Sequence, residues 1–206
     1  MVLAGNGRMI AALKSWWGSI EPPSIATITP WIQNGPPVTF MIVSREGDIL
    51  FDVGHKLAYT EVTNNATYVW AVFFGSGGEH AANCWHVNRC ASTAVVSASQ
   101  KDPCTSADVK HLNFKDSNNN LHDETNNYQT VETALSERGL LMRLNDRVIT
   151  PLQNHPDCDL IKVQLAQGNI VASAPMGKAS PIQWDGRTLD KLSAALDRVA
   201  EIEKSL

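Results

Sequence analysis

One stretch of the chain constrains its fold more than any other. Residues 68–74 form an apolar run of aromatic and β-branched residues, and a Gly-Ser-Gly-Gly run follows directly at 75–78. Such an apolar run is typical of a buried strand, and glycines let a strand turn sharply into the next element. Residues 80–99 then contain no helix breaker and place apolar residues at helical spacing. The stretch therefore predicts a buried strand, a tight glycine loop and one long helix.

The glycine loop has two interpretations. Free backbone N–H groups at the start of a helix can hold an anion or an oxyanion, which makes Gly75, Gly77 and Gly78 candidate anion-binding positions. A sharp turn from strand to helix also needs glycines for conformational reasons alone, and we favour that structural interpretation. By itself, the loop is a weak indication of function.

The preceding part of the chain predicts a helix and a hairpin. Residues 7–17 have an amphipathic helical period, and Gly18 with the Pro-Pro pair at 22–23 ends that helix. Residues 38–43 and 49–53 are apolar runs on either side of a short turn with a glycine, which predicts two antiparallel strands. A shorter strand is expected at 109–114, after the Asp-Pro turn at 102–103.

A polar stretch rich in Asn and Asp divides the chain. Residues 116–127 have the composition of a linker, so we expect one domain at 1–115 and a small α+β unit at 128–206. That unit should hold a helix at 128–138, strands within 140–150, 160–165 and 169–174, and a final helix at 188–206. The final helix has near-heptad leucines, which we assign to packing on its own domain, with pairing across a dimer as the alternative.

Composition excludes several functional classes. The chain has 206 residues, 43% hydrophobic and 18% charged, with a formal net charge of −4 and no basic cluster, so we expect a folded protein that does not bind nucleic acid. No apolar run approaches the roughly 20 residues needed to span a bilayer, and no signal sequence is visible, so we expect no membrane contact and a cytoplasmic location. Four cysteines are expected to be reduced thiols: Cys84, Cys90, Cys104 and Cys158.

The order of these elements resembles a known family. Helix, Pro-Pro, hairpin, aromatic strand, glycine loop, long helix and an Asp-Pro-Cys-Thr turn at 102–105 follow one another as in the second half of proteasome β-subunits and the bacterial HslV peptidase. These are N-terminal-nucleophile (Ntn) hydrolases, and the resemblance covers roughly residues 3–114. It implies an α+β protein with α/β layers, in which a truncated proteasome-like sandwich is followed by the small C-terminal unit.

The resemblance also implies roles for three residues. Ser76, Asp102 and Thr105 match positions that surround and polarise the N-terminal threonine of active members, so their expected roles are supporting ones. In that chemistry the terminal amine is the base for its own residue's hydroxyl, so the nucleophile must be residue 1 after processing. Residues 1–5 align with the strand before the family's first helix, which would put the nucleophile upstream of Met1. Ser106 and Ala107 stand where the family has glycines.

We therefore expect a non-catalytic, protein-binding protein of phage or mobile-element origin, a pseudoenzyme on a degenerate proteasome-like fold. Its expected partner is another protein, with some homo-oligomerisation, and no cofactor. The sheet edges left by the missing strands should be covered by residues 128–206 or by a partner chain. The first alternative is an Ntn-type peptidase or amidohydrolase that needs an upstream start or processing.

The sequence offers candidates for two further kinds of site. Cys84 followed by a tryptophan could serve a cysteine hydrolase, with His111, His122 or His155 as its base. A metal could be held by the spaced set His80, Cys84, His86 and Cys90, but the two i, i+4 pairs point in different directions around one helix. Packing of the cysteines in the core is the favoured interpretation for both sites.

Overall fold

The computed structural model describes residues 1–19, 25–34, 38–121, 128–143, 145–146, 148–171 and 184–205. The protein is of the α+β class, with helices and small antiparallel sheets. The elements of its larger part are β1 (Val2–Gly5), α1 (Gly7–Trp17), α2 (Ile25–Asn34), β2 (Val38–Val43), β3 (Ile49–Val53), β4 (Leu57–Thr63), β5 (Ala66–Phe73), α3 (Gly78–Asn88), α4 (Ala91–Ser99) and α7 (Gly186–Lys204).

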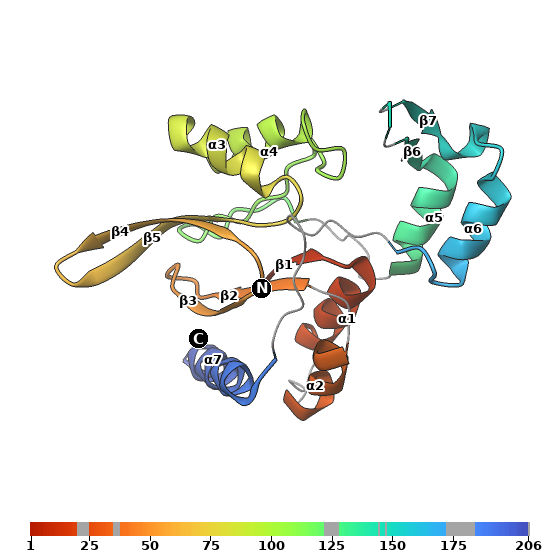
Figure 1. Ribbon diagram of the computed structural model, residues 1–206. Helices are drawn as coiled ribbons and strands as arrows, with labels where there is room; N and C mark the ends of the chain where they lie inside the picture. Colours follow the sequence, from red (N-terminus) through yellow and green to blue (C-terminus); the bar gives the residue numbers. More distant parts are fainter. Residues whose placement is uncertain are drawn as a thin grey trace.

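These elements lie in four levels. Figure 1 shows α3 and α4 above the β4–β5 hairpin, the three-stranded sheet below the hairpin, and α1, α2 and α7 below the sheet. The sheet is antiparallel in the order β1–β2–β3, so the hairpin predicted at 38–43 and 49–53 is confirmed. The helix predicted at 7–17 is also confirmed, and the Asn6 side chain caps it by accepting the backbone N–H groups of Arg8 and Met9.

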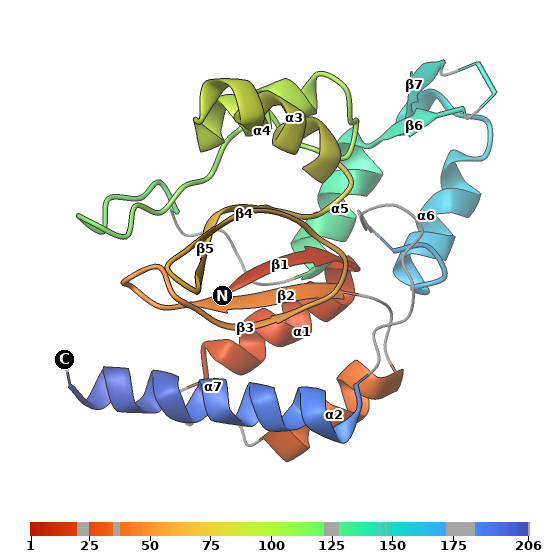
Figure 2. The ribbon, with the colours of Figure 1, turned by 60° about the vertical axis from the view of Figure 1, so that its left-hand side comes forward.

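The main core joins the sheet to the three helices below it. Leu13 of α1, Phe40 of β2 and Leu192 of α7 are fully buried in one hydrophobic cluster. Phe51 packs edge-on against Phe40 and stacks on Trp184, just before α7, with ring centroids 5.4 and 6.3 Å apart. Figure 2 shows α7 running along the underside of the sheet. The final helix, α7, therefore packs on the core formed by residues of the predicted first domain, although its residues belong to the predicted second unit. The division of the chain into domains at 1–115 and 128–206 stays a prediction.

The β4–β5 hairpin corrects the expectation for residues 68–74. They do form a strand, β5, but Tyr68 and Trp70 are more than half exposed, so the run is not a buried strand along its whole length. Its partner β4 was not predicted. Asn64 and Asn65 between the strands both have positive φ, as a tight hairpin turn requires, and the Asn pair is the sequence signal that could have revealed it.

The long helix predicted at 80–99 is wrong, because two helices occupy this stretch. α3 ends at Arg89, whose φ of 53° is left-handed, and α4 starts after Cys90. The Arg89 guanidinium lies over the Trp85 ring, 4.4 Å from its centroid, which supports the reversed backbone at this position. The break lets Ala94 and Ala98 of α4 pack in a second cluster with Trp85 of α3.

The strand predicted at 109–114 is also wrong, since this segment has only an isolated bridge between Leu112 and Asn119. The Asn120 side chain accepts the His111 N–H and donates to the Val109 carbonyl. An asparagine side chain thus takes the hydrogen bonds that a neighbouring strand would otherwise make. The second half of the predicted linker, residues 122–127, lies outside the described residues.

A smaller lobe follows, formed by α5 (Tyr128–Arg138), β6 (Leu140–Met142), β7 (Ile149–Pro151), the 3-10 helix η1 (Leu152–Asn154) and α6 (Cys158–Ala166). The helix at 128–138 is confirmed, and the strands expected within 140–150 form a short hairpin. The strand predicted at 160–165 is wrong: it is part of α6, because so short an apolar run has no period that separates strand from helix. Residues 169–171 are not a strand, and 172–174 lie outside the described ranges.

Candidate functional site

The three residues singled out by the family resemblance lie together. The Ser76 hydroxyl, in the loop before α3, donates to Oδ2 of Asp102 at 2.6 Å. The Thr105 hydroxyl donates to the same oxygen, also at 2.6 Å. The other oxygen, Oδ1, accepts the backbone N–H of Cys104 at 3.2 Å. The Asp102 carboxylate therefore ties the glycine loop to the turn that follows α4, across 26 residues of chain.

The electrostatics of this cluster favour an ionised carboxylate. Burial raises the pKa of Asp102, but the hydrogen bonds from Ser76, Thr105 and Cys104, together with the charge of nearby His80, outweigh it. The pKa of Asp102 is therefore lowered from its ordinary value of 3.8. A carboxylate with a low pKa is a poor base for a hydroxyl group, so Asp102 can orient Ser76 and Thr105 but is poorly suited to activate either as a nucleophile.

The glycine loop is shaped by close approach. A Cβ on Gly77 would lie 2.2 Å from the Thr105 hydroxyl oxygen and 3.2 Å from Oδ2 of Asp102, so this position has no room for a side chain. Gly75 has a φ of 85°, and its carbonyl accepts the N–H of Gly78 in a turn. The Asp102 carboxylate thus lies beside the N-terminus of α3, where a negative charge is stabilised. Binding of an external anion at Gly75, Gly77 and Gly78 stays a prediction.

An apolar cleft of about 510 Å³ opens beside this cluster. Its walls are β1, the start of α1, the end of β5, the glycine loop and the inner face of α4, and none of the described residues that line it has a charged side chain. All four residues of β1, Val2–Gly5, line the cleft, as expected when the edge of a strand faces a cavity. In its sheet β1 pairs only with β2, so this edge has no strand partner among the described residues.

The cleft was not predicted from the sequence. Val95 of α4 lines it, whereas the adjacent Val96 does not and is exposed. Both are valines in a helix of small residues, so no sequence signal separates them. None of the described residues in the 128–206 segment lines this cleft. The expectation that this segment or a partner chain covers the sheet edges stays a prediction.

The cysteine and metal candidates are not assembled into a site. Within the described ranges, no group of three or more His, Cys, Asp or Glu side chains is arranged to hold a metal ion. The hydrogen-bond partners of the Cys84 thiol are the Asn88 side chain, at 3.3 Å, and the Thr93 carbonyl, at 3.8 Å, rather than a histidine. Cys84 also packs against the second core cluster, and all four cysteines are free thiols. His122 lies outside the described residues.

Cys90 occupies the N-cap of α4, without a side-chain capping hydrogen bond. Its interaction with nearby Thr93 lowers the pKa of the Cys90 thiol. Because Cys90 lies beyond the helix break, it no longer shares a helix with His80, Cys84 and His86, as the metal hypothesis had required.

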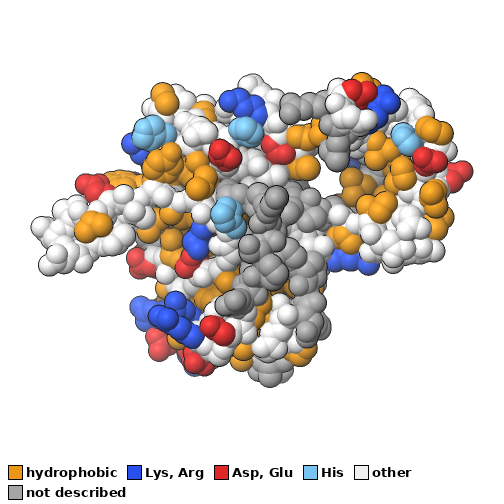
Figure 3. All heavy atoms as spheres, in the orientation of Figure 1, with side chains coloured by type: hydrophobic (Ala, Val, Ile, Leu, Met, Phe, Trp, Pro, Cys, Tyr) orange, Lys and Arg blue, Asp and Glu red, His pale blue; other side chains and the backbone are white. Residues whose placement is uncertain are grey.

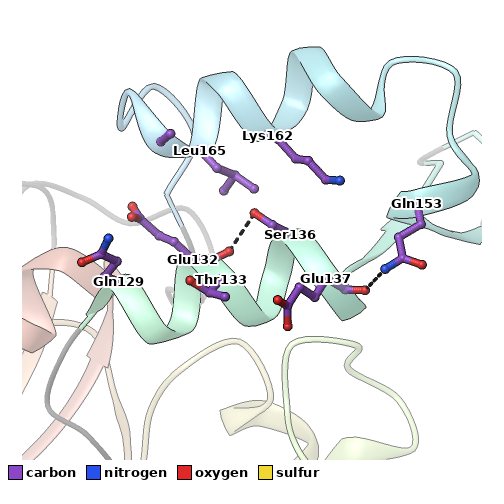
Figure 4. A pocket seen from close by; sticks show the side chains of 9 residues that line it. Gln129, Glu132, Thr133, Ser136, Glu137, Gln153, Lys162 and Leu165 are labelled. Atoms are coloured by element: carbon purple, nitrogen blue, oxygen red, sulfur yellow. Dashed lines mark hydrogen bonds between the residues drawn. The ribbon is translucent and has the colours of Figure 1, made fainter.

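A second pocket, of about 330 Å³, lies in the smaller lobe between α5, η1 and α6. Figure 4 shows Ser136 of α5 and Lys162 of α6 directed into the gap between the two helices. Gln153 donates to the backbone carbonyl of Glu137 and closes one end of the gap. Most of the residues that line this pocket have polar or charged side chains, in contrast to the cleft beside Ser76, and the sequence offered no motif for it.

Comparisons of this chain with protein-family models, with curated proteins and with solved structures found no match. The site can therefore be interpreted only from its own geometry. In the part of the chain that the structure describes, no helix is both long enough and apolar enough to cross a bilayer.

Proposed function

We propose that this protein is a non-catalytic, protein-binding protein that holds an extended, apolar segment of a partner protein in the cleft beside Ser76. The observation that carries the proposal is the unpaired edge of β1 in an uncharged cleft. An extended peptide can add to such an edge by main-chain hydrogen bonds, and its alternate side chains can enter the cleft. The low pKa of Asp102 is consistent with a structural rather than a catalytic role for the cluster.

The proposed scaffold is a proteasome-like Ntn layer arrangement. Two observations support this resemblance: helices lie outside two layers of strands (Figure 1), and Ser76, Asp102 and Thr105 meet in one hydrogen-bonded cluster. A cytoplasmic location and a phage or mobile-element origin remain predictions from the sequence. A shared architecture would in any case not assign a function, because function depends on the site.

The proposal is tested by filling the cleft. Val95→Trp places an indole in the cleft from α4, and Val96→Trp places the same group on the exposed side of the same helix. Binding of fluorescent extended peptides with apolar and charged sequences is measured by anisotropy. We expect apolar peptides to bind, Val95→Trp to weaken binding at least about tenfold, and Val96→Trp to leave it unchanged. Equal effects of the two variants, or a preference for charged peptides, would contradict a binding site in this cleft.

A matched pair of variants separates binding from catalysis. Ser76→Ala and Asp102→Ala remove the hydroxyl and the carboxylate that the family resemblance assigns to catalytic support. If the protein only binds, the peptide complex persists in both variants, provided that circular dichroism shows both to be folded. Turnover of a fluorogenic peptide by the wild-type protein, lost in either variant, would overturn the non-catalytic assignment.

The second candidate is an Ntn-type peptidase or amidohydrolase. It is favoured by the same cluster of Ser76, Asp102 and Thr105, which lies at the wall of a cleft large enough for a peptide. This candidate requires a terminal Thr, Ser or Cys whose amine acts as the base. The intact mass of the protein expressed from its own gene with the native upstream region identifies the first residue, and acylation of that amine would abolish hydrolysis.

A further inference from the structure

The gap between α5, η1 and α6 in the smaller lobe is a hollow separate from the cleft beside Ser76. No described residue lines both of them. The gap has a volume of about 330 Å³. At ~30 Å³ for each water-sized group, this volume holds roughly ten non-hydrogen atoms. The gap therefore has the size of a site for a small molecule rather than for a peptide.

One cation faces this gap. Figure 4 shows the Lys162 side chain directed from α6 into the gap, and it is the only Lys or Arg among the described residues of the lining. Lys162 is half-buried, and its ammonium group has no ion pair or hydrogen bond with another described residue. Moving an ammonium group partly out of water without a partner costs free energy. The gap therefore favours a bound group with a negative charge.

The two acidic residues of the lining do not neutralise this ammonium group. The Glu132 carboxylate is engaged by Arg8 of α1, in an ion pair of 2.7 Å. Glu137 is exposed, and its backbone carbonyl accepts a hydrogen bond from Gln153. A singly charged acid needs only the contact with Lys162, whereas a phosphate dianion would bring a second negative charge close to these two carboxylates. The charges of the lining therefore favour a monoanion.

The surface beside Lys162 suits a short hydrocarbon chain. Leu165, which is only 4% exposed, lines the gap three residues further along α6, on the same face of that helix, and Ala166 follows it. From α5, the Ser136 hydroxyl is directed into the gap and donates to the Glu132 carbonyl at 2.9 Å. A hydroxyl can rotate, so Ser136 can donate to a bound carboxylate instead. The gap thus combines a cation, a hydroxyl and an apolar surface.

The packing of the lobe gives an independent argument for a bound molecule. None of the described residues of α5 is buried, although this helix lies beside α6. Helices in proteins are stabilised mainly by packing of an apolar face, so a helix that buries no residue is weakly held. A molecule that fills the gap would add contacts between α5 and α6 and would stabilise the folded lobe by binding to it.

We propose that the gap between α5 and α6 binds a small monocarboxylic acid with a short apolar chain. The carboxylate pairs with Lys162, and the chain packs on Leu165. This site goes beyond the proposed peptide binding and does not depend on it. One partly exposed ion pair and a small apolar contact contribute little free energy, so the Kd should be about 0.1–1 mM.

Three probes and two matched variants test the site. The probes are hexanoate, hexanamide, which has the same chain without the charge, and inorganic phosphate. Lys162→Gln removes the cation from the gap, and Lys191→Gln removes an exposed cation from α7. Binding is measured by titration of amide chemical shifts. We expect saturable binding of hexanoate, binding of hexanamide and phosphate at least about tenfold weaker, a similar loss for hexanoate in Lys162→Gln, and no change in Lys191→Gln.

Three outcomes overturn the proposal: no saturable binding of hexanoate up to about 20 mM, equal binding of hexanamide, or tighter binding of phosphate. Equal binding of hexanoate to Lys162→Gln and to the wild-type protein also overturns it. A second measurement does not depend on variants. With saturating hexanoate, amide hydrogen exchange of the wild-type protein should slow in α5 and α6, while exchange in β2 and β3 stays constant. Slowing confined to other elements would place the bound acid elsewhere and reject this site.

Discussion

The larger part of the molecule and the smaller lobe are similar in secondary structure and differ in how they are held together. Around the three-stranded sheet, side chains from α1, α2, β2, β3 and α7 form one continuous core. In the lobe at 128–171, Leu152 and Leu165 are the buried hydrophobic residues among those described, and α5 buries none. Exposed apolar side chains gather over the lobe instead (Figure 3). Regular helices alone therefore do not indicate an independently stable unit.

The lobe depends on contacts with the larger part. Arg8 of α1 forms an ion pair with Glu132 at 2.7 Å, lies 5.7 Å from the centre of the Tyr128 ring, and approaches the Leu165 carbonyl. A Cβ on Gly168 would collide with the Arg8 guanidinium, so the chain after α6 closes over the same side chain. One arginine thus joins both helices of the lobe to α1. The two regions should therefore respond differently to substitution.

The largest expected effect is in the main core. Phe40→Ala removes a fully buried ring that packs on Phe51, and it should lower the free energy of unfolding by about 3–5 kcal/mol. Urea denaturation followed by fluorescence measures this value. Leu160→Ala in the lobe, where the side chain is exposed, is the control and should change stability by less than about 0.5 kcal/mol. If both variants lost the same free energy of unfolding, the proposed difference in packing between the larger part and the lobe would be contradicted.

A buried lobe residue should give a smaller and more local effect. Leu165→Ala should cost about 2–3 kcal/mol, because the cavity lies between helices that have little other packing. Hydrogen exchange should speed up in α5 and α6, while β2 and β3 remain protected. Faster exchange in all these elements together would show that the two regions unfold as one unit.

The glycine loop offers a comparison within the larger part. Gly77→Ala puts a methyl group against Thr105 and should cost about 1–3 kcal/mol, since the turn after α4 must shift. Gly186→Ala, at the start of α7, meets no neighbouring atom and should be neutral or slightly stabilising. Thermal unfolding of the two variants measures the contrast. A neutral Gly77→Ala would mean that the loop and the turn are not in close contact.

The smallest expected effect is a dependence on pH. The folded pKa of Asp102 lies below its ordinary value of 3.8, so the folded state binds protons less readily than the unfolded state. The stabilisation is fully present above the ordinary value and is lost as pH falls through the folded pKa. As the pH falls below about 5, the free energy of unfolding should decrease less in Asp102→Asn than in the wild-type protein. Asp197→Asn, an exposed carboxyl on α7, serves as the control.

Local patterns were the most predictable part of the fold. Helices at 7–17 and 128–138 were predicted with the bounds observed, because a helical pattern is contained within a few turns of the chain. Predictions failed where the deciding contact is remote or concerns the backbone. Arg89 breaks the helix at 80–99 in a left-handed conformation, and Asn120 replaces the strand at 109–114 with side-chain hydrogen bonds.

The candidate site likewise has one part that was predicted from the sequence and one part that was not. The meeting of Ser76, Asp102 and Thr105 was expected because the family resemblance supplied an order of elements, whereas spacing alone could not bring positions 76 and 102 together. Neither the cleft nor the exposed β4–β5 hairpin was predicted from the sequence. Both depend on which residues remain uncovered after packing, and a strand that is apolar throughout has no pattern to distinguish its buried half from its exposed half.

The sequence by itself determined the α+β class, the helices α1, α5 and α7, the β2–β3 hairpin and the glycine-lined turn before α3, because these follow from local periodicity and from the conformational freedom of particular residues. Only the tertiary structure decided that α7 completes the core of the larger part, that β1 presents a free edge to an apolar cleft, and that the β4–β5 hairpin extends beyond the body (Figure 1). These are results of long-range packing, in which the burial of a side chain depends on elements far away in the chain.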